Sequence, residues 1–367
     1  MPNTRWIFHV TWALSLGLLF AGGCARASQE RAERDLEVGK AEGHGLAIEV
    51  ASGLAAVRRL ASGELVLWSS APAWSLTLTS KDDVPTTWLV SLENVLPDVE
   101  LTGSVPIELV SNTLATRKQY RVQLPAGART TLTMAPPDAQ DSSSWRFAVM
   151  SDVQEAIDDV GDIYQKVNQT PKVRFLLGAG DLTQQGTDAE LERFKDELTS
   201  LDVPYYTTLG NHELGDGGPA YQDWYGRASF SFVYRSVRFS MLDTASATID
   251  PMVYDWLDGW LDQGKDGVHV VAMHIPPIDP VGVRNGSFAS RNEAAKLLTR
   301  LAKGKVDVTL YGHIHSYYSF DNAGIPAYIS GGGGAIPERF DNVGRHFLVV
   351  DVDPSRGVSA VSKVEVD

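Results

Sequence analysis

Apolar and polar residues alternate in short runs through the first third of the chain. The runs 46–50, 74–78 and 120–124 show this pattern, and a turn sequence at 125–127 follows the third of them. Alternation with a period of two places apolar side chains on one face of a strand. Roughly eight such strands predict an antiparallel β-sandwich over 44–136. No catalytic constellation lies in it, so we interpret it as a structural or docking module.

Pro136 and Pro137, followed by three serines at 142–144, interrupt this pattern and indicate a domain boundary. Apolar, strand-like runs follow at 147–150, 175–177, 205–209, 239–242, 268–273 and 306–311. Helical patterns lie between several of them, at 161–169, 188–201, 252–263 and 293–303. This alternation predicts a second domain over 145–352 in which helices cover a sheet, so the expected fold class is α+β with an α/β-like second half.

The composition excludes several classes of protein, partner and site. The chain has 367 residues, with 43% hydrophobic and 21% charged, which excludes a disordered or multi-span membrane protein. Its net charge of −14 repels phosphate backbones, so long nucleic acid is not an expected partner. Its single cysteine excludes an intramolecular disulfide and a cysteine-rich zinc site.

The first 27 residues have the layout of an export signal. Arg5 precedes the apolar run 6–20, and small residues then lead to Cys24. The sequence Ala21-Gly22-Gly23-Cys24 resembles a bacterial lipobox, so we expect lipid attachment at Cys24. Cleavage before Ser28 and an uncleaved anchor are the alternatives. The protein is therefore expected to be exported to the periplasm or cell envelope, anchored in the membrane by its lipid.

Two further segments flank the predicted domains. Residues 28–43 are charged and lack Phe, Trp and Tyr, which predicts a solvated tether, with a short helix as the alternative. Residues 353–367 are expected to form a C-terminal tail.

Polar side chains cluster directly after the strand-like runs of the second domain. They are Asp152, Asp181, Asn211, His212, His274, His313 and His315. The carboxyl ends of strands in such sheets meet at one edge, where open α/β folds place their sites. Carboxylate, amide and imidazole ligands suit divalent Mn, Fe, Zn or Ni, and a shared carboxylate suggests a pair of ions. The sequence therefore predicts a site for two metals.

The motifs, in order, are Asp152-Val153-Gln154, Gly180-Asp181, Gly210-Asn211-His212-Glu213, His274 and Gly312-His313-Ile314-His315. They resemble those of the calcineurin-like metallophosphoesterase superfamily over about 145–352. The resemblance implies a four-layer α/β/β/α domain and an enzyme that hydrolyses phosphoric mono- or diesters through a metal-bridging hydroxide.

By this resemblance, the first metal is bound by Asp152, Asp181 and His315. Asp181 bridges to the second metal, which Asn211, His274 and His313 also bind. His212 matches the catalytic histidine, and together with Asn211 it would contact the substrate.

Gln154 departs from the family pattern, which usually has His at this position. An amide oxygen is a harder and weaker donor than imidazole, so the first metal is expected to be bound differently. Gln184 stands where purple acid phosphatases place a Tyr, so an iron–tyrosinate centre is not expected.

Substrate contacts are less well marked. Arg284 follows the His274 loop in a Pro- and Gly-rich stretch and could bind a phosphate oxygen, or be a solvated loop residue. The alternative to an enzyme is a degenerate member that binds metal or phosphate without turnover, which Gln154 favours.

Overall fold

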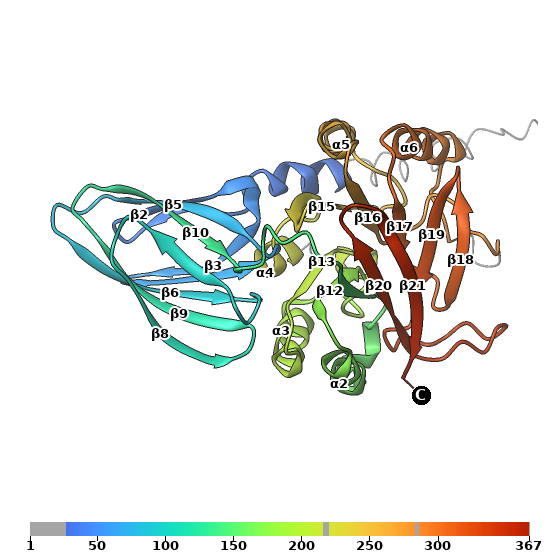
Figure 1. Cartoon of the computed structure of the whole chain (residues 1–367), viewed down its shortest axis with the longest axis horizontal. Coiled ribbons are helices and arrows are strands. Elements are labelled where there is room, and N and C mark those ends of the chain that lie inside the picture. Colours follow the sequence, from blue (N-terminus) through green and yellow to red (C-terminus); the bar gives the residue numbers. More distant parts are fainter. Residues whose placement is uncertain (1–26, 216–219, 283–285, 367) are drawn as a thin grey trace, which may run out of the picture.

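The computed structural model describes residues 27–215, 220–282 and 286–366 (Figure 1). The predicted export signal with Cys24, and Arg284, lie outside these ranges. In the described part of the chain, no helix has the length and apolar character needed to cross a membrane.

The first domain is the predicted sandwich, with ten strands in two five-stranded sheets. One sheet has the order β1 (Lys40–Gly43), β2 (Leu46–Val50), β5 (Trp74–Ser80), β10 (Arg129–Ala135) and β7 (Glu100–Gly103). The other has the order β3 (Ala55–Ala61), β4 (Glu64–Ser69), β6 (Thr86–Glu93), β9 (Arg117–Leu124) and β8 (Ile107–Leu114). Within the sandwich, β4 and β6 pair in parallel and all other neighbouring strands pair antiparallel. The alternating apolar residues of β5, such as Leu76 and Leu78, are buried between the sheets.

The second domain contains two further sheets. The first has the order β13 (Tyr205–Thr208), β12 (Val173–Ala179), β11 (Trp145–Met150), β20 (His346–Asp353) and β21 (Gly357–Glu365). The second has the order β14 (Phe230–Tyr234), β15 (Val237–Leu242), β16 (Val268–Met273), β17 (Val308–Tyr311), β19 (Ile325–Ser330) and β18 (Tyr317–Asn322). Strands β11, β12 and β13 run parallel in one sheet, and β15, β16, β17 and β19 do so in the other.

Helices cover both outer faces of this pair of sheets (Figure 1). Helices α2 (Gly161–Gln169) and α3 (Asp188–Glu197) pack on the first sheet, and α5 (Pro251–Gly264) and α6 (Arg291–Lys303) on the second. The short α4 (Tyr221–Tyr225) lies beside the sandwich. Aromatic side chains fill the space between the sheets, with Phe147, Phe175 and Phe239 in mutual contact. The four-layer α/β/β/α prediction is confirmed.

The charged segment 28–43 is not a solvated tether. Residues 27–35 are helical, and β1 completes an edge of the sandwich. Arg31 forms a buried ion pair with Asp243, with Nε 2.6 Å from Oδ2. Asp35 accepts hydrogen bonds from the backbone N–H groups of Ala228 and Ser229, each at 2.8 Å. Polar side chains that suggested solvation instead bind this segment to the second domain.

The expected tail is also part of the fold, because β21 pairs with β20 along its length. The sandwich in turn is fixed to the second domain. The side-chain amide of Asn94 forms hydrogen bonds with both backbone groups of Tyr205 on edge strand β13. It donates to the carbonyl oxygen at 2.8 Å and accepts from the N–H at 2.7 Å. Trp68 packs edge-on against Tyr225, with ring centroids 5.4 Å apart. The sandwich therefore supports the strand that leads to Asn211.

Candidate metal centre

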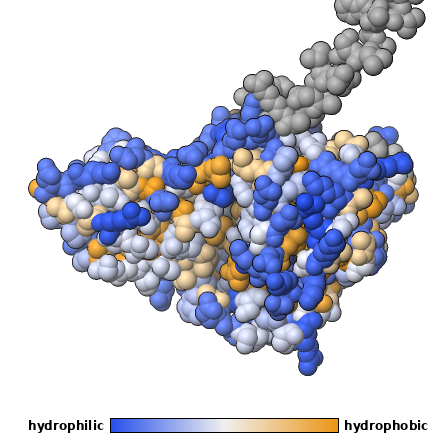
Figure 2. Space-filling model, turned by 90° about the horizontal axis from the view of Figure 1, so that it is seen from above, coloured by the Kyte–Doolittle hydropathy of each residue, from blue (hydrophilic) through white to orange (hydrophobic). Residues whose placement is uncertain are grey.

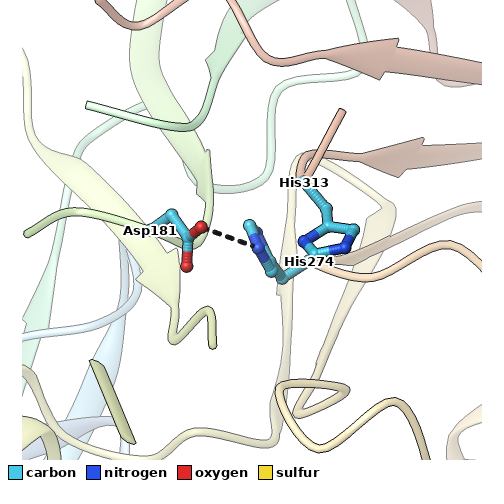
Figure 3. Close-up of side chains that lie close together, drawn as sticks. All are labelled: Asp181, His274 and His313. Atoms are coloured by element: carbon cyan, nitrogen blue, oxygen red, sulfur yellow. Dashed lines mark ion pairs between the residues drawn. The ribbon is translucent and has the colours of Figure 1, made fainter. Parts of the chain in front are cut away.

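The predicted ligands converge at the carboxyl ends of neighbouring parallel strands. The pairs of strand and side chain are β11 with Asp152, β12 with Asp181, β13 with Asn211, β16 with His274 and β17 with His313. Figure 3 shows the carboxylate of Asp181 facing the ring of His274, with His313 beside it. The ligand atoms of these three residues lie within 4.8 Å of one another.

Asp181 is the centre of the cluster. Its Oδ2 lies 3.1 Å from Nε2 of His274, and that nitrogen lies 3.1 Å from Oδ1 of Asn211. Nε2 of Gln154 donates to the same Oδ2 at 2.9 Å. Asp181 therefore contacts His274, a predicted ligand of the second metal, on one side and Gln154 on the other.

The second group of ligands surrounds Asp152. Oδ1 of Asp152 lies 3.5 Å from Nε2 of His315, and the backbone N–H of His313 donates to its Oδ2 at 3.0 Å. Nε2 of Gln154 lies 3.1 Å from the same His315 nitrogen. The amide of Gln154 thus stands between Asp181 and His315, two of the residues predicted to bind the first metal. Its carbonyl oxygen could face an ion there after rotation of the amide.

Two histidines present their Nε2 atoms to the site in a fixed tautomer. Nδ1 of His274 donates to the carbonyl oxygen of Ala179 at 2.8 Å, and Nδ1 of His315 donates to that of Ile336 at 2.7 Å. A carbonyl can only accept, so Nδ1 carries a proton in both rings, and Nε2 is the nitrogen that can give a lone pair to an ion once its own proton is released. This is the usual support of a metal-binding histidine.

The electrostatics also indicate a cation. Burial opposes an imidazolium, but the negative charges of Asp181 and Asp152 outweigh it and raise the pKa of His274 to about 9. Burial acts to raise the pKa of Asp152 and Asp181, yet the facing imidazoles hold both below their usual range. Buried carboxylates that stay ionised need positive charge nearby, and a divalent ion on this donor set supplies it.

The backbone is strained at the site. Asp152, Gln154, Asp181 and His313 have φ values of 63°, 48°, 53° and 71°, in the left-handed region that residues other than glycine seldom adopt. Such conformations cost about 1–3 kcal/mol each and persist where function needs them. Gly210 allows the loops to meet, because a Cβ there would lie 2.0 Å from Oδ1 of Asp181.

Glu213 has a role that our sequence reasoning missed. It is fully buried and accepts hydrogen bonds from the backbone N–H groups of Asp181 (3.0 Å), Thr183 (2.9 Å) and Gly210 (2.7 Å). Burial and the charge of Asp181 raise the pKa of Glu213 to about 7. Its side chain joins the loops that carry Asp181 and Asn211, so it is a positioning residue. Its place in the Gly210–Glu213 motif was the available signal.

His212 lies at the open side of the cluster. Its backbone N–H donates to Oδ1 of Asp181 at 2.9 Å, and its Nδ1 donates to the carbonyl oxygen of Gln184 at 2.7 Å. Nε2 lies 3.9 Å from Oδ2 of Asp181, and the side chain is 28% exposed. This nitrogen can therefore meet a substrate while the rest of the residue is held.

The structure thus brings Asp152, Gln154, Asp181, Asn211, His212, His274, His313 and His315 to one place. Gln184 borders it through its carbonyl oxygen, with no tyrosine at that position.

Comparisons with known proteins show what this part of the chain is similar to. Residues 146–317, which contain all eight residues, match the calcineurin-like phosphoesterase family. A 3′,5′-cyclic-nucleotide phosphodiesterase of Nostoc sp. is 25% identical over 158 residues, 40% of this chain and 58% of the relative. A probable glycerophosphodiester phosphodiesterase of Arcobacter nitrofigilis is 26% identical over 163 residues, 40% of this chain and 59% of the relative. The chain thus spans less than two thirds of each relative.

A solved structure extends the likeness in fold to the sandwich. The purple acid phosphatase from yellow lupin (Lupinus luteus) seeds superposes with a TM-score of 0.52, covering 80% of this chain and 70% of its own, at 16% identity. This coverage exceeds the length of the second domain alone. The segment 146–317, which carries the clustered ligands, thus matches the calcineurin-like phosphoesterase family, and the lupin structure shows the same fold.

Proposed function

We propose that this protein hydrolyses phosphoric esters with two divalent metal ions. The observation that carries the proposal is the position of Asp181 between two sets of ligands, His274 with Asn211 on one side and Gln154 with His315 on the other. A carboxylate shared in this way is the usual bridge of a two-metal centre.

The residues have separable tasks in this proposal. Asp152, Gln154 and His315 would hold the first ion, and Asn211, His274 and His313 the second, with Asp181 shared. The pair of ions would supply Lewis acidity and activate water at neutral pH. Asn211 would orient the phosphoryl group. Protonated His212 would donate from Nε2 to the leaving oxygen, because its Nδ1 is engaged by Gln184.

The donor set restricts the metal to a class. Its ligand atoms are carboxylate and amide oxygens and imidazole nitrogens, which suit Mn, Fe, Zn or Ni. Gln154 places an amide where an imidazole would bind more strongly, so we expect the ion beside Asp152 to dissociate first.

The substrate and the location complete the proposal. The two relatives are named for phosphodiesters and the lupin protein is a phosphatase, so both ester classes belong in a first screen. A net charge of −14 disfavours polynucleotides and leaves small esters. We further propose that the enzyme works outside the cytoplasm, with Cys24 as its lipid anchor, on the basis of the apolar run and lipobox-like sequence before that residue.

The test is hydrolysis of p-nitrophenyl phosphate and bis(p-nitrophenyl) phosphate by protein stripped with chelator and reloaded with Mn, Fe, Zn, Ni or Mg. Asp181→Asn and His212→Ala should each lose at least about 100-fold in kcat/KM. Asp202→Asn, which changes an exposed carboxylate, should behave as wild type. Folded wild-type protein that is inactive with every metal would refute the proposal and favour a degenerate, non-catalytic binder.

A further inference from the structure

A groove with a volume of about 510 Å³ opens beside the metal centre. Gln154, Gln184, His212 and His315 line its inner side. Its outer side is the segment 336–340, together with Glu155. We call residues 336–340 the outer wall. Because His212 borders the groove, an ester whose phosphorus lies at the ligands can extend an organic group into it.

The outer wall is fastened to the ligand loops by backbone groups. The N–H of Ala335, just before it, donates to the carbonyl oxygen of Asp152 at 2.9 Å. The carbonyl oxygen of Ile336 accepts from His315 Nδ1, and the N–H of Glu338 donates to the carbonyl oxygen of His315 at 3.1 Å. On the far side, Oδ2 of Asp341 accepts from Tyr318 at 2.6 Å. The wall is therefore a fixed surface.

Two large apolar side chains of this wall are left in water. Ile336 is 68% exposed and Phe340 is 46% exposed, and both line the groove. On the face seen in Figure 2, hydrophilic residues predominate and hydrophobic ones are scattered, and single exposed apolar residues such as Val84 occur elsewhere in the chain. Apolar groups that converge on a cleft with catalytic side chains are typical of a ligand site.

The charges along the groove are unfavourable to a doubly charged ester. Glu155 and Glu338 line it, and Arg339 is the lone Lys or Arg among its lining residues. A phosphomonoester carries close to two negative charges at neutral pH, whereas a phosphodiester carries one. The second ester group of a diester also needs a surface to rest on, which the apolar wall provides.

We propose that the outer wall selects phosphodiesters that carry an apolar group, which Ile336 and Phe340 contact while the phosphoryl group lies at the metal ligands. This inference rests on the proposed hydrolytic function and names its substrate class.

The experiment compares two diesters with the same leaving group. Bis(p-nitrophenyl) phosphate has an aryl second group, and methyl p-nitrophenyl phosphate has a methyl group in its place. In the wild-type protein, kcat/KM should be higher for the aryl diester than for the methyl diester, and higher for both than for p-nitrophenyl phosphate. Phe340→Ala and Ile336→Ala should each lower the ratio of aryl to methyl kcat/KM by about tenfold, mainly through KM.

Two further variants complete the design. Val84→Ala removes an apolar side chain in the sandwich whose exposure (63%) lies between those of Phe340 and Ile336, and it should leave the ratio unchanged. Glu338→Gln should raise kcat/KM for the monoester relative to the aryl diester. If wild type hydrolyses both diesters but neither wall variant changes the ratio, the wall proposal is wrong and the proposed function stands. If no ester is hydrolysed at all, the proposed function itself fails.

Discussion

Replacement of Glu213 by Gln tests whether this buried carboxylate holds the metal centre together. Glu213 divides its oxygens between two pairs of donors. Oε2 accepts from the N–H groups of Asp181 and Gly210, and Oε1 accepts from the N–H and the hydroxyl of Thr183. Glutamine keeps the shape of the side chain but has one oxygen. Its amide nitrogen must face one of the two pairs.

The expected loss of unfolding free energy follows from the hydrogen-bond donors that Glu213→Gln leaves without an acceptor. A buried donor without a partner costs about 1–3 kcal/mol, so two of them cost about 2–6 kcal/mol. Removal of the carboxylate charge offsets part of this loss in unfolding free energy. Burial raises the pKa of Glu213, so its ionised form is costly at neutral pH. We expect the metal-free Gln variant to lose about 2–3 kcal/mol of unfolding free energy. Its metal affinity should fall by about 10–100-fold, since the Asp181 and Asn211 loops are no longer held in register.

Urea unfolding of the metal-free protein and competition with a chelator measure the two effects. Glu190→Gln is the matched control. Glu190 accepts from the N–H groups of Gln185 and Thr187 at 3.0 and 3.2 Å, but in solvent at the start of α3. The Glu190→Gln substitution should lower the free energy of unfolding by less than about 1 kcal/mol and leave metal affinity unchanged. A Glu213→Gln protein with wild-type unfolding midpoint and metal affinity would refute the positioning role.

Three further predictions concern other sites. Gln154→His should tighten binding of the ion beside Asp152, because imidazole is the stronger donor and His tolerates a φ of 48°; equal affinities by chelator competition would contradict this. Arg31→Met should cost about 3–5 kcal/mol in urea unfolding, because it leaves Asp243 buried and unpaired, and adding Asp243→Asn should recover part of the loss. Burial raises the pKa of Asp35 from 3.8 to about 7, so the folded state keeps a proton that the unfolded chain has released. Its contribution to stability therefore falls as pH rises from about 4 to about 7, and Asp35→Asn should flatten the change in urea midpoint over that range.

Strong local patterns explain what the sequence predicted well. The helix predicted at 161–169 is α2, and the strand predicted at 268–273 is β16, with the same bounds. The helix has a clear helical period and the strand is an almost unbroken apolar run, so the local sequence is sufficient to predict both. The ligand cluster was predictable for a related reason. Each ligand directly follows a strand, and parallel strands bring their carboxyl ends to one edge.

Long-range pairing explains what was missed. Arg31 and Asp35 look like ordinary surface charges in a polar stretch, and their partners are about 200 residues away, at Asp243 and at the backbone of Ala228 and Ser229. The outer wall was missed because Ile336 and Phe340 are isolated apolar residues in a loop without periodicity. Their significance comes from the groove that they border, which local sequence does not show.

The outer wall has two tasks, to fix the tautomer of His315 and to contact the substrate, and different groups of the wall perform them. Its fastenings to the ligand loops run through the backbone of Ala335, Ile336 and Glu338, whereas the groove meets its side chains. A change of side chain at Ile336 or Phe340 therefore alters the surface offered to a substrate but leaves the carbonyl that fixes the His315 tautomer. A deletion in this segment would instead move that carbonyl and weaken the binding of the first metal ion that we propose. We therefore expect selectivity to change through substitutions in this wall, and activity to fail through changes in its length.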